Sequence, residues 1–93
     1  MSSEYALRES PPGWIKDLPR DSEEGAVVKE VGVVETFGDN RYWKVFQLIE
    51  KDDGSEMIRP GYYTGDNNYQ NKPLMLPPEV MKDLTEFADG KIW

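Results

Sequence analysis

The segment 41–64, RYWKVFQLIEKDDGSEMIRPGYYT, constrains the fold more than any other part of the chain. Aliphatic, aromatic and β-branched residues dominate both arms around the dipeptide Asp53-Gly54, which is typical of a β-hairpin. A two-residue turn at this dipeptide pairs residues whose numbers sum to 107. This register predicts one apolar face formed by Trp43, Val45, Ile49, Ile58 and Tyr62.

The opposite face of the predicted hairpin mixes aromatic, apolar and basic side chains, namely Tyr42, Lys44, Phe46, Leu48, Met57, Arg59 and Tyr63. A sheet that is covered on one side only should alternate apolar and polar residues. Two largely apolar faces therefore indicate that another element, a partner chain or a ligand covers the second face. Because Pro60 cannot donate a ladder hydrogen bond, its strand is an edge strand or is bulged, and a bulge would exchange the facing of the two neighbouring tyrosines.

Two further strands are predicted outside the hairpin. The run VVKEVGVVETF within 26–37 is rich in β-branched residues, and Gly32 marks a bend or bulge in it. The alternation places one set of side chains on a common side: Val27, Val31, Val33 and Phe37. Residues 72–76 are short and apolar enough to form a fourth strand.

A C-terminal helix is predicted after Pro77-Pro78-Glu79, since prolines fit the first helical turn and an acidic residue complements the helix dipole there. Gly90 ends the helix. Apolar residues recur at helical spacing, at Val80, Met81, Leu84, Phe87 and Ala88. The fold class is therefore α+β, a four-stranded antiparallel sheet packed against one C-terminal helix. We expect the helix to cover the face that carries Val45, Ile49 and Ile58.

The length of 93 residues predicts a single domain. Residues 1–24 are rich in Ser, Glu, Asp and Pro, so we expect a flexible or irregular N-terminal lead-in, followed by one sheet-plus-helix domain over 25–93. Trp14, Ile15 and Leu18 are spaced for one short helical turn, which either anchors this lead-in on the domain or forms a partner-binding motif.

The composition argues against most enzyme classes. The chain has neither cysteine nor histidine, which removes disulfides, thiolate metal sites, cysteine or serine-histidine nucleophiles and the usual zinc ligands. We therefore predict a protein that is not an enzyme, with no catalytic residues, no metal and no cofactor. The net charge of −7 opposes undirected attraction to phosphate backbones, so any basic patch must be local.

The N-terminal run MSSEYALRESPP has no basic end followed by an apolar stretch, and the sequence has no apolar run near the length of about 18 residues that spans a bilayer. These patterns predict a cytoplasmic protein that does not associate with a membrane.

The mixed face of the hairpin supplies the candidate site residues Tyr42, Lys44, Phe46, Arg59 and Tyr63. Aromatic rings stack on unpaired bases, and neighbouring cations contact phosphate. The same residues also suit packing, against a curled sheet or across a homodimer. The sequence leaves both interpretations open.

The patterns MIRPGYYTG and KPLMLPPEVMKDLTEFA resemble the transcriptional positive-cofactor-four family of single-stranded-DNA-binding coactivators, over about residues 26–90. The resemblance implies a strand with an Ile-Arg-aromatic signature, a short strand over 72–76 and an amphipathic helix. It also implies a homodimer formed partly through that helix, with Leu84 and Phe87 in dimer or core packing and the five candidate residues contacting an unpaired DNA strand.

The sequence thus predicts a small non-enzymatic binding module. In one hypothesis the aromatic and basic face binds single-stranded nucleic acid. In the alternative, this face is a protein-interaction or homodimerisation surface that binds no nucleic acid.

Overall fold

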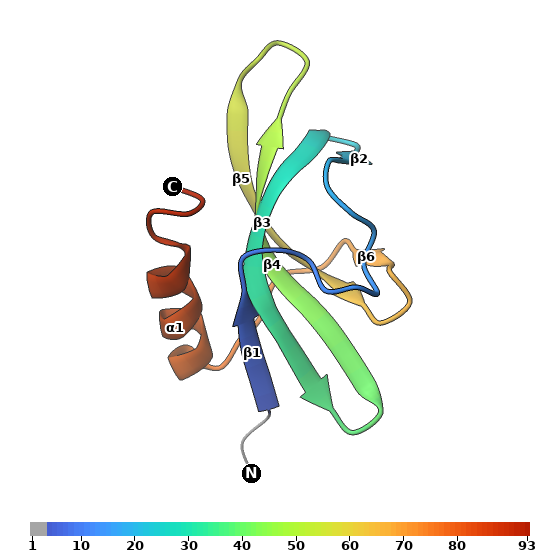
Figure 1. Cartoon of the computed structure of the whole chain (residues 1–93), viewed down its shortest axis with the longest axis vertical. Coiled ribbons are helices and arrows are strands. Elements are labelled where there is room, and N and C mark those ends of the chain that lie inside the picture. The colour runs from blue at the N-terminus through green and yellow to red at the C-terminus, as the bar shows by residue number, and fades with distance from the viewer. Residues whose placement is uncertain (1–3) are drawn as a thin grey trace.

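The computed structural model describes residues 4–93 and contains an antiparallel sheet with one helix against it (Figure 1). Its elements are β1 (Glu4–Arg8), β2 (Arg20–Ser22), β3 (Gly25–Phe37), β4 (Asn40–Glu50), β5 (Glu56–Thr64), β6 (Tyr69–Gln70) and α1 (Pro78–Ala88). The strand order is β1-β3-β4-β5-β6, and β2 also pairs with β3. The antiparallel sheet and the C-terminal helix confirm the predicted class, but the sheet has six strands and not four.

The additional strands come from segments that we expected to be irregular. The described part of residues 1–24 contributes β1 and β2, which pair with opposite ends of β3. Residues 72–76 form no strand, which corrects that prediction, and the short β6 precedes them. Pro73 has no N–H for a ladder, and this stretch serves as the connection from β6 to α1.

The β4–β5 hairpin is paired one residue away from the predicted register. Its loop has three residues, Asp52, Asp53 and Gly54, closed by a hydrogen bond of 2.8 Å from the Lys51 N–H to the Ser55 carbonyl oxygen. Gly54 has a φ of 86° and so occupies the left-handed position of a three-residue hairpin loop. Because the loop has three residues and the predicted turn has two, every β5 side chain lies on the face opposite to the predicted one.

A bulge in β3 lies between Val27 and Lys29. It places Val27 opposite Ile49, whereas Val31 and Val33 project from the other face, opposite Phe46 and Lys44. The prediction that the three valines share one side is therefore wrong for Val27. Gly32 lies in regular pairing, and its lack of a side chain is needed because a Cβ there would collide with the Lys44 carbonyl oxygen.

The helix packs on the face of the sheet that carries Phe46 and Leu48, which we call the helix face. The buried cluster there consists of Val31, Val33, Val80, Leu84, Ala88 and Ile92. Our expectation that α1 covers Val45 and Ile49 is therefore wrong. The boundaries of the helix agree with prediction, because it starts at Pro78 and is followed by Gly90 with a φ of 80°.

The opposite face, called here the N-terminal face, carries a second buried cluster formed by Ile15, Trp43, Val45 and Tyr63. Trp14 and Tyr69 pack against it, so the N-terminal segment and the β6 region cover this side. Glu30 and Gln47 are also fully buried in the sheet. Buried polar groups require polar partners, and the N-terminal segment supplies one to this face through Arg20.

Candidate functional site: an aromatic groove on the helix face

The structure divides the five predicted site residues between the two faces of the sheet. Tyr42, Lys44 and Phe46 alternate along β4 on the helix face, together with Val31 and Val33 of β3. Tyr63 packs in the buried cluster of the N-terminal face, and Arg59 hydrogen-bonds to the buried Gln47 on the same side. A single surface shared by all five side chains, as we predicted, is therefore not formed.

A groove of about 300 Å³ opens on the helix face beyond the part that α1 covers. It is lined by Phe37, Tyr42, Lys44, Tyr62, Pro73 and Met75. These residues come from the adjoining ends of β3, β4 and β5 and from the connection between β6 and α1. We call this site the aromatic groove.

Three rings form the wall of the aromatic groove. Tyr42 lies between Phe37 and Tyr62, with centroid distances of 6.2 Å and 6.3 Å and interplanar angles of 63° and 70°. Such edge-to-face contacts hold rings in a preferred arrangement. Phe37 is 48% exposed and Met75 is 75% exposed, so the groove presents apolar surface to solvent.

Lys44 is held in place by groups of the protein itself. Its Nζ lies 2.6 Å from Oε1 of the buried Glu35 and donates a hydrogen bond of 3.0 Å to the Met75 carbonyl oxygen. The ammonium also lies 5.6 Å from the centre of the Tyr42 ring. The lysine charge is therefore neutralised locally by Glu35, whereas the nucleic-acid hypothesis uses this cation to contact phosphate.

Phe46 belongs to the packing beneath the helix. Its ring lies 5.2 Å from that of Trp93, and it contacts the cluster formed by α1 and β3. Trp93 remains 52% exposed. Phe46 thus contributes to stability beneath the C-terminal segment and does not line the aromatic groove.

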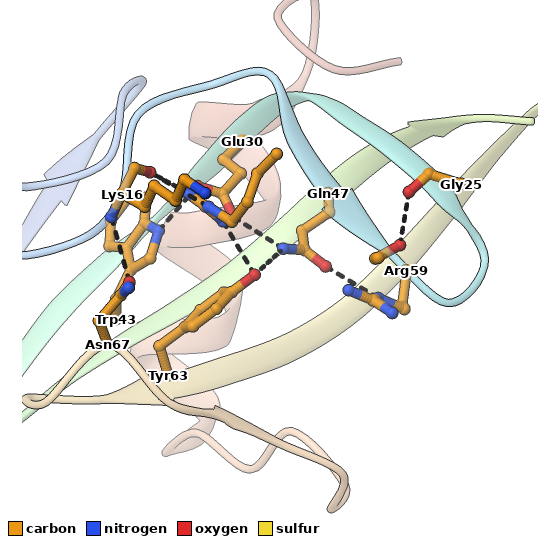
Figure 2. A network of polar contacts seen from close by, with 10 residues as sticks. Lys16, Gly25, Glu30, Trp43, Gln47, Arg59, Tyr63 and Asn67 are labelled. Atoms are coloured by element: carbon orange, nitrogen blue, oxygen red, sulfur yellow. Dashed lines mark hydrogen bonds and ion pairs between the residues drawn. The ribbon is translucent and has the colours of Figure 1, made fainter.

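On the N-terminal face, Glu30 is the centre of a buried polar network (Figure 2). Both of its carboxylate oxygens accept hydrogen bonds from the Arg20 guanidinium, at 2.8 Å and 3.1 Å. Oε1 also accepts from the Trp43 indole at 3.1 Å, and Oε2 from the Gln47 amide at 2.7 Å. A buried carboxylate with four donors is well compensated for its loss of water.

The remaining members of the network connect this carboxylate to β5. The Tyr63 hydroxyl accepts hydrogen bonds from Arg20 at 2.8 Å and from Gln47 at 3.1 Å. Burial by itself lowers the pKa of the Arg20 guanidinium, but the hydrogen bonds and the charge of Glu30 outweigh burial and raise that pKa. Arg20 is therefore permanently charged in the interior, and the Tyr63 hydroxyl is engaged in a hydrogen bond with it.

Arg59, the other predicted contact residue on this face, is also engaged. Its Nε donates to Gln47 Oε1 at 2.9 Å, and its guanidinium lies 4.3 Å from the centre of the Tyr69 ring. The guanidinium makes a longer ion pair of 3.5 Å with the exposed Glu24. Arg59 therefore closes the outer end of the network.

Sequence reasoning missed the groove residues Phe37, Tyr62, Pro73 and Met75, and it missed the network around Glu30. The predicted register placed Tyr62 on the wrong face. The alternative of a bulge at Pro60, which exchanges the facing of Tyr62 and Tyr63, places it on the observed face. A signal for the network was available, since Gln47 interrupts an otherwise apolar row between Val45 and Ile49.

Residues 4–93 contain no group of three or more carboxylate side chains arranged to hold a metal ion. In the same range, no helix has the length and apolar character needed to cross a membrane. Comparisons with protein-family models, with curated proteins and with solved structures found no match for this chain. The resemblance to the positive-cofactor-four family therefore stays a prediction from short motifs.

Proposed function

We propose that this protein is a small non-enzymatic binding module that takes up an apolar segment of another protein in the aromatic groove. The observation that carries the proposal is the wall of three rings, with Phe37 exposed and Tyr42 and Tyr62 half-buried, beside a lysine whose charge is already paired with Glu35. Aromatic residues and methionine are the side chains enriched at the centres of protein interfaces, and charged residues are depleted there.

The pairing of Lys44 favours a protein ligand over a polyanion. A phosphate would have to compete with Glu35 at 2.6 Å for the ammonium, and the net charge of −7 would repel it over longer range. An apolar segment needs no such exchange, because its affinity comes from surface removed from water against the rings and Met75.

The experiment is selection of peptides from a phage-displayed random library on the immobilised protein, followed by fluorescence anisotropy with a labelled winning peptide. Tyr62→Ala should weaken binding of that peptide by about tenfold or more, as expected when a central aromatic anchor is removed. Met57→Ala is the matched control, since this side chain is half-exposed and lies on the other face of the same strand. A selection that yields no peptide sensitive to Tyr62→Ala would overturn the proposal.

A second candidate function, binding of single-stranded nucleic acid, is favoured by one specific observation. The Lys44 ammonium lies within 6 Å of the ring centres of both Phe37 and Tyr42, a combination suited to stacked bases and nearby phosphate. This function predicts that a labelled single-stranded oligonucleotide binds at low salt, that high salt releases it, and that Tyr42→Ala abolishes the binding.

Light scattering over a range of protein concentrations tests a third form of the proposal, in which the partner is a second copy of the chain.

A further inference from the structure

A larger hollow of about 710 Å³ adjoins the aromatic groove, and Tyr42 lines both. The hollow lies between the β3–β4 turn and the β5–β6 loop, where it is bordered by Asp39 and Asp66. A segment that leaves the aromatic groove past Tyr42 therefore enters a region edged by carboxylates.

The charges around this hollow are unequal. Hydrogen bonds from the Thr64 hydroxyl, together with the Asn68 amide at 2.8 Å, lower the pKa of the Asp66 carboxyl and keep it ionised. The cation that lines the hollow is Arg41, and its guanidinium lies 4.4 Å from the centre of the Trp14 ring, stacked on the side chain that covers the N-terminal face. The lining of the hollow thus carries two negative charges, from Asp39 and Asp66, and one positive charge, from Arg41, whose guanidinium is stacked on Trp14.

We infer that the segment bound in the aromatic groove carries a lysine or arginine next to its apolar residues, and that this cation enters the hollow between Asp39 and Asp66. The inference rests on the proposed protein-binding function and specifies the chemistry of the partner. A guanidinium placed there can stack on the outer side of Tyr42 and pair with a carboxylate, a combination that suits arginine in particular. The net charge of −7 acts in the same direction by attracting basic partners over longer range.

The test uses the same library selection and reads the composition of the peptides that depend on Tyr62. These peptides should be enriched in sequences that place Lys or Arg beside an aliphatic or aromatic residue. A synthetic, labelled peptide of the most frequent sequence is then titrated at low and at high salt against the wild type and the double variant Asp39→Asn with Asp66→Asn. The double variant should bind about tenfold more weakly at low salt, with a reduced salt dependence.

The control is the double variant Asp52→Asn with Glu56→Gln, which changes the net charge equally but lies at the β4–β5 end of the hairpin, away from the groove, and leaves the Asp53-Gly54 dipeptide intact. Equal weakening by both double variants would mean that only the overall charge matters, and it would overturn the inference. Tyr62-dependent peptides without basic residues would also overturn it while leaving the proposed function intact. Absence of any Tyr62-dependent peptide would overturn both, and thermal unfolding of each variant confirms that the fold is retained.

Discussion

The two faces of the sheet use the same residue types in opposite ways. On the N-terminal face, Tyr63 and Arg59 form hydrogen bonds within the network centred on Glu30, and the N-terminal segment and the β6 region cover this face. On the helix face, Tyr42 and Tyr62 lie beyond the end of the helix packing and line an open groove. A tyrosine or a cation in a strand therefore indicates function only after its internal partners have been identified.

The largest expected effect comes from breaking the interior network. Glu30→Ala removes the carboxylate that neutralises the buried Arg20 guanidinium and accepts from the Gln47 amide, and removal of one partner of a buried ion pair costs about 3–5 kcal/mol of unfolding free energy. Urea unfolding measures the loss. The combined variant Glu30→Leu with Arg20→Met should recover much of it, because no charge then remains unpaired. A loss below about 1 kcal/mol for Glu30→Ala would mean that the network does not stabilise this face.

A smaller effect is expected where β3 and β4 approach each other. Gly32→Ala places a methyl group against the Lys44 carbonyl oxygen and the Val45 side chain, so the strands must separate at a cost of about 1–3 kcal/mol. Gly13→Ala is the control, because a Cβ at that position meets no atom within 4 Å. Thermal unfolding of both variants compares the sites, and equal stability of the two would contradict the close approach of the strands.

The neighbouring tyrosines give the sharpest comparison of the two faces. Tyr63→Phe removes an acceptor shared by Arg20 and Gln47, which should cost about 1–2 kcal/mol of unfolding free energy. Tyr62→Phe removes a hydroxyl on the groove side and should change stability by less than about 0.5 kcal/mol. Denaturant titration of the pair distinguishes the faces. The reverse order of effects would show that the pairing of β5 with β4 is that of the two-residue turn.

The class of fold and the extent of its main elements could be predicted from local patterns. Strand residues between 26 and 64 and the proline-initiated helix are specified by β-branched runs, Gly-containing turns and helical spacing. The register could not be predicted, because the sequence Asp52-Asp53-Gly54 fits a two-residue turn at its last two positions or a three-residue loop that ends on glycine. The choice changes every assignment on β5.

The location of the helix and the content of the site depended on contacts that are distant in sequence. No glycine within the bulge near Val27 indicates it in the sequence, and the bulge determines which valines contact α1. Arg20 meets Glu30 and Tyr63 because a segment expected to be irregular returns across the sheet. Of the five predicted site residues, Tyr42 and Lys44 line the aromatic groove, and they were identified by the alternation of one strand alone.

The β4–β5 loop, at the end of the hairpin in Figure 1, has a consequence for how this protein can diverge during evolution. The molecule extends over 45 Å, yet the loss of one residue from this exposed tip would bring Tyr63 outward and drive Tyr62 inward. Among homologous sequences, substitutions at Asp52 should be frequent, whereas insertions and deletions beside Gly54 should be rare. A constraint on the length of this exposed loop would thus reflect selection on the proposed aromatic groove at the other end of the same strands.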